Sequence, residues 1–178
     1  MVNDWFVFSF YLLMELNDYL KIMNETVKMN QRDLIIGEGR TPVSKSAYIK
    51  LVSGSKYDTI SLEDIKELLA YYQEMTEKTG KQLNWDYKSA AFPYEIIEKE
   101  QSGIQYLLLQ GKDPHLYHYL MIGVEQTEEG HQIHIVLPTQ ATHGDYAKAN
   151  ELSRFLAKQV HGELHMFNGR TMYFYKRK

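Results

Sequence analysis

Apolar positions follow a helical spacing between Ser61 and Gly80, where they recur every three or four residues. Ser61-Leu62-Glu63-Asp64 predicts the start of this helix, because a serine and a carboxylate three residues later can satisfy its first free backbone amides. Gly80 suits the position just after the helix, where a glycine accepts a left-handed backbone. The pattern therefore predicts one amphipathic helix with both ends marked.

A second helix has the same spacing, begins near Thr142 or Asp145, and ends at His161-Gly162. The other apolar segments are short, and Gly, Ser, Asn or Pro residues separate them, which is typical of strands. The predicted strands are residues 46–52, 94–99, 104–110, 117–124 and 131–137, and two more in a hairpin over 163–175.

This order, β-α-β-β-β-β-α-β-β, predicts an α+β fold. Four consecutive strands between two helices favour a largely antiparallel sheet, with the two helices on one face. A chain of 178 residues is long enough for one domain with a sizeable core.

Pairing strand 117–124 with strand 131–137 indicates which side chains share a face. With Val124 opposite His131, the aliphatic residues share a face that we place under the helices: Leu120, Ile122, Ile133 and Ile135. The other face then carries aromatic and sulfur-containing side chains beside a histidine: Tyr117, Tyr119, Met121 and His134.

The hairpin adds two tyrosines. Asn168-Gly169 predicts a type I′ turn, and in that register Tyr173 and Tyr175 share a face with Leu164 and Met166. Both sheet faces are then more apolar than a two-layer domain requires. A Tyr-rich second face indicates a groove or an interface for a protein partner or a second copy, unless loops or the N-terminal segment cover it. The predicted partner-binding residues are Tyr119, Met121, His134, Tyr173 and Tyr175.

Residues 1–42 are expected to be an N-terminal extension to the domain at 43–178. Their apolar run, Trp5 to Met14, is too short to cross a bilayer and has the pattern of an amphipathic helix. An alternative is a mis-assigned start, because Gly37-Glu38-Gly39-Arg40 can be encoded by a purine-rich ribosome-binding site and Val43 by a GTG start codon.

Composition narrows the function classes. Twenty Lys and Arg residues against 23 Asp and Glu residues give a net charge of −3, which disfavours non-specific nucleic-acid binding. The chain has no cysteine, so disulfides and thiolate chemistry are excluded.

Known catalytic and metal-binding patterns are also missing from the sequence. Neither a nucleophile elbow, a phosphate loop nor H-E-x-x-H occurs, and His131 and His134 point to opposite faces of a strand. We assign no catalytic residue, metal or cofactor. Two alternatives stay open: a small hydrolase or transferase that uses a histidine and a carboxylate, and an RNA-binding domain that uses Tyr173, Tyr175 and the basic end 176–178.

Four segments resemble a known family: Ser46–Val52, Ser89–Ile96, Gly162–Arg170 and Met172–Arg177. They are similar to domain-of-unknown-function family 1885, small proteins of spore-forming Gram-positive bacteria, over about residues 44–178. The resemblance implies a small cytosolic α+β domain with no assigned activity and no catalytic residues to transfer. Together these points predict a non-enzymatic cytoplasmic module that binds a protein partner, or itself, through the Tyr-rich face.

Overall fold

The computed structural model describes residues 45–84, 87–101 and 103–175. The predicted extension at 1–42 and the basic end 176–178 lie outside these ranges. The described elements, in chain order, are β1 (Lys45–Lys50), α2 (Leu62–Leu83), α3 (Tyr87–Ala91), β2 (Tyr94–Gln101), β3 (Ile104–Gly111), β4 (Tyr119–Thr127), β5 (Gly130–Leu137), α4 (His143–Val160), β6 (Glu163–His165) and β7 (Thr171–Tyr173).

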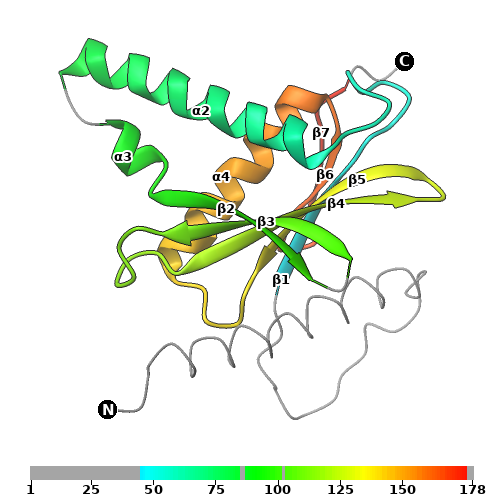
Figure 1. The fold of residues 1–178 in the computed structure, drawn as a ribbon. Coiled ribbons are helices and arrows are strands. Elements are labelled where there is room, and N and C mark those ends of the chain that lie inside the picture. Colours follow the sequence, from blue (N-terminus) through cyan, green and yellow to red (C-terminus); the bar gives the residue numbers. More distant parts are fainter. Residues whose placement is uncertain (1–44, 85–86, 102, 176–178) are drawn as a thin grey trace, which may run out of the picture. The chain divides into compact units, whose positions relative to one another are not determined.

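The α+β prediction is confirmed. The described strands form one seven-stranded sheet in the order β2-β3-β4-β5-β1-β6-β7, and every neighbouring pair is antiparallel (Figure 1). The element order matches the prediction except for the short helix α3. β1, the first of the described strands, lies inside the sheet between β5 and β6.

Both long helices pack on one side of the sheet and share its core (Figure 1). Ile65 and Leu69 of α2 and Leu152 and Leu156 of α4 join the inward side chains of the strands in a single buried cluster. No helix in the described ranges is long and apolar enough to cross a membrane.

Both long helices begin directly after the capping residues that the sequence predicted. Ser61 caps α2 and Thr142 caps α4, each in a complete capping box with an aspartate at the third helical position. The predicted end of α2 at Gly80 is wrong: the helix continues to Leu83, and Asn84 adopts the left-handed conformation after it. Asparagine tolerates that conformation better than most residues, so it can replace a terminal glycine.

The predicted β4–β5 register is wrong by two residues. Val124 pairs with Ile133, not with His131, because the strands extend to a tight turn in which Thr127 pairs with Gly130. A shift of two residues preserves which face each side chain occupies. Leu120, Ile122, Ile133 and Ile135 therefore do lie in the core beneath the helices.

The predicted β6–β7 register is wrong by one residue. Leu164 pairs with Met172, so Tyr173 lies on the face opposite Leu164. The turn is not type I′, since Gly169 has a φ of 77° but Asn168 does not have a positive φ. Instead, the Gly169 amide bonds the Met166 carbonyl and the Met166 amide bonds the Arg170 carbonyl, which leaves a three-residue loop.

Candidate partner-binding face

The side of the sheet opposite α2 and α4, called here the second face, carries an apolar row across four strands. The registers place Ile97 of β2 beside Leu108 of β3, Leu108 beside Met121 of β4, and Met121 beside Val136 of β5. None of these four side chains belongs to the core under the helices or packs against it. A sheet covered on one side only would present polar residues here, whereas Leu108, Met121 and Val136 are apolar and only 4%, 2% and 1% exposed.

A mixed aromatic and polar row lies next to it. His134 of β5 is opposite Tyr48 of β1, and Tyr48 is opposite His165 of β6. The ring of Tyr48 is stacked on His165, with centroids 4.4 Å apart, and lies 6.0 Å from His134. The second face thus carries aliphatic side chains along the apolar row on β2, β3, β4 and β5, and aromatic and titratable side chains on β1, β6 and β7.

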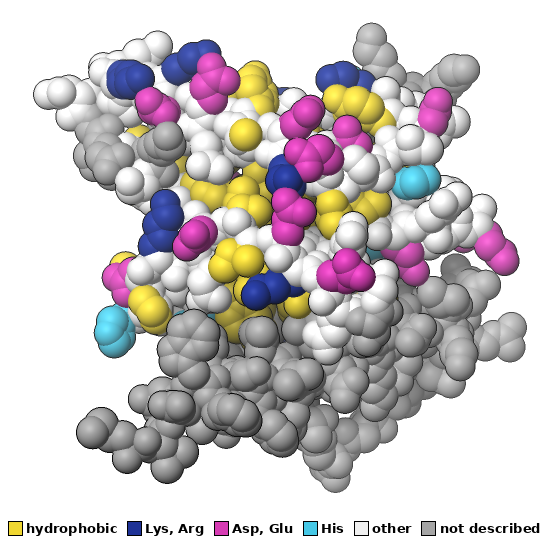
Figure 2. Space-filling view, in the orientation of Figure 1, with side chains coloured by type: hydrophobic (Ala, Val, Ile, Leu, Met, Phe, Trp, Pro, Cys, Tyr) yellow, Lys and Arg dark blue, Asp and Glu magenta, His cyan; other side chains and the backbone are white. Residues whose placement is uncertain are grey.

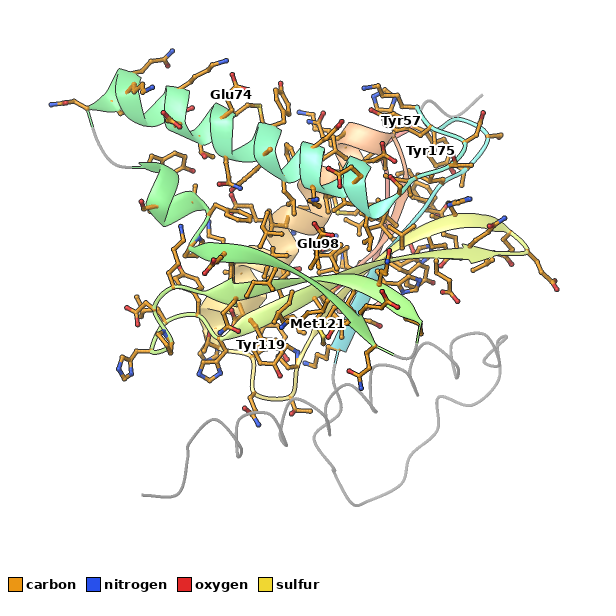
Figure 3. All side chains as sticks on the ribbon, viewed as in Figure 1. Tyr57, Glu74, Glu98, Tyr119, Met121 and Tyr175 are labelled. Carbon is orange, nitrogen blue, oxygen red and sulfur yellow. The ribbon has the colours of Figure 1, made fainter. Side chains whose placement is uncertain are left out.

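The five predicted partner-binding residues do not form one cluster. Tyr119, Met121 and His134 lie together on β4 and β5, whereas Tyr173 lies on β7, four strands from β4. Figure 3 shows Tyr119 and Met121 on the side of the sheet away from α2, whereas Tyr175 lies far from both, in the region where Tyr57 is labelled. With about 4.8 Å between neighbouring strands, β7 lies about 14 Å from β5 and about 19 Å from β4.

Their exposure also differs. Met121, His134 and Tyr119 are buried, with 2%, 3% and 7% of their surface exposed, whereas Tyr173 is 45% exposed. The five residues therefore differ in exposure, and their role in partner binding stays a prediction.

Burial controls the charge state of His134. Loss of solvent lowers the pKa of His134 to about 4 and raises the pKa of Glu125. The Nε2 atom of His134 lies 3.1 Å from Oε2 of Glu125, but the two groups are not aligned for a hydrogen bond, so Nε2 is buried without one. His134 is consequently neutral at pH 7.

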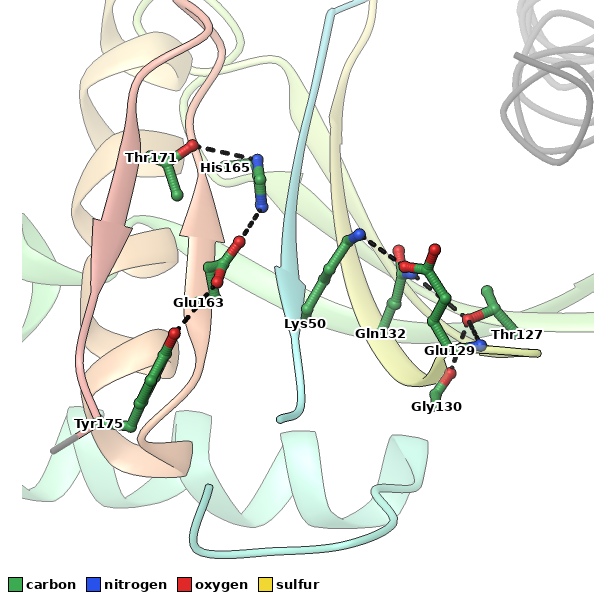
Figure 4. Close-up of polar contacts among 9 residues, drawn as sticks. All are labelled: Lys50, Thr127, Glu129, Gly130, Gln132, Glu163, His165, Thr171 and Tyr175. Carbon is green, nitrogen blue, oxygen red and sulfur yellow. Dashed lines mark hydrogen bonds and ion pairs between the residues drawn. The ribbon is translucent and has the colours of Figure 1, made fainter. Parts of the chain in front are cut away.

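A second histidine–carboxylate pair lies at the other end of the face (Figure 4). The His165 ring is held between Oε1 of Glu163, 2.8 Å from Nε2, and the Thr171 hydroxyl, 3.3 Å from Nδ1. The Tyr175 hydroxyl donates to the other oxygen of Glu163 at 3.3 Å. Thr171 is directly opposite His165, so ordinary cross-strand pairing brings these groups together.

Lys50 adds a charge beside this pair. Its Nζ lies 2.8 Å from Oε2 of Glu129 in the β4–β5 turn, and the hydrogen bond raises the pKa of Lys50 while lowering that of Glu129 (Figure 4). The Thr127 hydroxyl donates to the Gly130 carbonyl at 2.9 Å and closes the same turn. The ion pair between Lys50 and Glu129 thus links the β4–β5 turn to β1.

Among the described residues, no group of three or more histidine, aspartate or glutamate side chains could hold a metal ion. One open cavity of about 720 Å³ in the described part of the chain is lined by Lys56, Lys158, Gln159, His161 and Phe174, and none of these belongs to either histidine–carboxylate pair. Acidic and basic side chains are interspersed on the side of the molecule shown in Figure 2.

Sequence reasoning missed several residues of the second face, above all Tyr48 and His165. The alternation in residues 46–50 does put Tyr48 on the face opposite Ala47 and Ile49. What it cannot show is that β1 lies between β5 and β6, because that pairing joins residues far apart in the chain.

Comparison with known proteins gives two matches. A family model described as "Domain of unknown function (DUF1885)" matches residues 45–176. A crystal structure of a protein of unknown function from Bacillus stearothermophilus is 40% identical, covers 82% of this chain and 99% of its own, and has a TM-score of 0.46. No curated protein matches. The family match confirms the predicted resemblance.

Proposed function

The chain belongs to the DUF1885 family of domains of unknown function, and we propose that it is a non-enzymatic cytosolic module that binds a protein partner on its second face. The apolar row of Ile97, Leu108, Met121 and Val136 carries this proposal. Leu108, Met121 and Val136 are already buried, so a partner removes further apolar surface from water mainly at Ile97, at about 25 cal/mol for each Å².

The two ends of the face support different steps of binding. Tyr173 is exposed, and tyrosine supplies a large apolar ring with a hydroxyl that tolerates water before a partner arrives. We therefore expect first contact at the β6–β7 end. Met121 is 2% exposed, so we do not expect it to make the first contact.

The test compares Tyr119→Ser/Tyr173→Ser with the wild-type chain. Light scattering gives the mass of each protein in solution, and immobilised chains are compared for the proteins that they retain from a bacterial lysate. We expect the double variant to lose self-association or a retained partner. Tyr71→Ser is the matched control, because Tyr71 is 47% exposed but lies on α2, on the helix side. Unchanged mass together with unchanged retained proteins would contradict the proposal.

A second candidate, a small hydrolase or transferase, is favoured by one observation. Glu163 and Thr171 hold the two ring nitrogens of His165, so the imidazole has a carboxylate on one side and a hydroxyl on the other. Hydrolysis of a p-nitrophenyl ester tests this candidate. A rate that His165→Asn abolishes but His115→Asn leaves unchanged would support it over the binding role.

A further inference from the structure

β2 is an edge strand of the described sheet and carries several exposed charged side chains. It lies at the end of the described sheet with only β3 beside it, and it spans eight residues. Glu95, Glu98, Lys99 and Glu100 are exposed. Charged residues usually protect such an edge against other strands, so their pattern decides whether it can pair at all.

The hydrogen-bond pattern shows which backbone groups of β2 are turned outward. The Lys112 amide donates to the Pro93 carbonyl at 2.9 Å, so Pro93 and Lys112 form a hydrogen-bonded position of the β2–β3 ladder. Such positions alternate along an antiparallel pair. The odd-numbered residues of β2 therefore bond to β3, while Ile96 and Glu98 direct their amides and carbonyls away from the sheet.

The sequence of β2 is self-complementary about Ile97. In an antiparallel pair with a second β2 whose two-fold axis passes through Ile97, Ile96 is opposite Glu98 of the other copy, and both have outward backbone groups. Glu95 is then opposite Lys99, twice by symmetry, and Ile97 is opposite itself. Glu95 and Lys99 form no ion pair within the described part of the chain.

We propose that a second copy of this chain pairs with the β2 edge in this register and joins two sheets into one. The neighbouring register that keeps outward backbone groups opposite each other has its two-fold axis at Glu98. It puts Glu98 opposite Glu98, which is repulsive. The register on the other side has its axis at Ile96, and it leaves Glu95 opposite Ile97. The Ile97-centred register alone pairs both carboxylates at 95 with both ammonium groups at 99.

This pairing also continues the second face. Ile97 is the first side chain of the apolar row, so Ile97 of each copy brings the two rows end to end across the axis. On the helix side, Glu98 keeps its own partner, because Lys66 of α2 lies 2.7 Å from it. The dimer therefore leaves the ion pair between Glu98 and Lys66 intact.

A charge swap tests the pairing on the full chain. Sedimentation equilibrium over a wide range of protein concentration gives the dimer dissociation constant. Lys99→Glu places two pairs of like charges opposite each other, and we expect the dimer to weaken by about tenfold; Glu95→Lys has the same expected effect. The double variant Glu95→Lys/Lys99→Glu restores opposite charges and should recover wild-type association.

Lys158→Glu is the control, because Lys158 is exposed on α4 and its substitution changes the net charge equally. A monomeric wild-type chain, a double variant that fails to recover, or a Lys158→Glu effect equal to that of Lys99→Glu would each overturn the proposal. It does not depend on the proposed function: Tyr119→Ser/Tyr173→Ser leaves the β2 edge intact, so failure of one proposal does not imply failure of the other.

Discussion

Replacing Asp145 with asparagine should test how the fold is held together beneath α4. Asp145 is fully buried and is the third residue of α4, in the capping box with Thr142. Its Oδ2 accepts from the Thr142 amide at 2.9 Å and from the His118 amide at 3.0 Å. Its Oδ1 accepts from the Tyr94 hydroxyl at 2.7 Å. One carboxylate thus joins α4, β2 and the start of β4.

The expected loss in the free energy of unfolding follows from the hydrogen-bond donors that lose their acceptor in Asp145→Asn. Asparagine offers one oxygen, so if it accepts from Tyr94, its amide group faces the two backbone amides of Thr142 and His118. A buried donor left unsatisfied costs about 1–3 kcal/mol, and removing the buried charge returns part of that energy. We therefore expect Asp145→Asn to lower the free energy of unfolding by about 3 kcal/mol.

The chain contains its own control in the capping box of α2. Asp64 accepts from the Ser61 amide at 2.7 Å in the same arrangement, but at an exposed site. Water can replace those bonds, so Asp64→Asn should cost at most about 1 kcal/mol. Urea unfolding followed by circular dichroism measures both. With a slope of about 2 kcal/mol per molar urea, the midpoints should fall by about 1.5 M and at most about 0.5 M. Equal losses would refute the claim that burial makes Asp145 a structural link.

Three further predictions concern the described domain. The pKa of His134 in the folded chain is about 4, below its ordinary value of about 6.5, so between these pH values only the unfolded chain takes up the proton. The free energy of unfolding should therefore fall by about 3 kcal/mol as the pH drops from 6.5 to 4. Urea unfolding at several pH values measures this fall, and an equal fall in His134→Phe would contradict the prediction. Gly169→Val should destabilise by more than about 1 kcal/mol through backbone strain alone, since φ is 77° and an added Cβ meets no atom within 4 Å; thermal unfolding measures it, with Gly169→Asn expected to be milder. A chain that starts at Ser44 should keep a cooperative thermal transition, and a molten or insoluble product would show that residues 1–42 belong to the core.

Local signals in the sequence predicted the helices because the forces that start a helix act within a few residues. The pairs Ser61–Asp64 and Thr142–Asp145 contain both halves of a capping box, and the structure has both. The helix α3 was missed because five residues are too few to show a period. Strand positions were also predictable, since turn residues separate them.

Strand registers were less predictable because they depend on turn geometry. The two-residue error at β4–β5 left every side chain on its predicted face, whereas the one-residue error at β6–β7 moved Tyr173 away from Leu164. That second error came from Asn168-Gly169, whose sequence suits a two-residue turn although only Gly169 adopts a positive φ.

The composition of the second face follows from where β1 enters the sheet. Because β1 lies between β5 and β6, it places Tyr48 between His134 and His165 and separates the aliphatic row from Tyr173. An aliphatic surface binds many partners with little discrimination, whereas stacked rings and paired charges require matching groups. In the proposed binding role, we therefore expect the part on β2, β3, β4 and β5 to provide affinity and the part on β1, β6 and β7 to provide selectivity. A partner that uses both must extend across the full width of the sheet, which single strands predicted in isolation do not reveal.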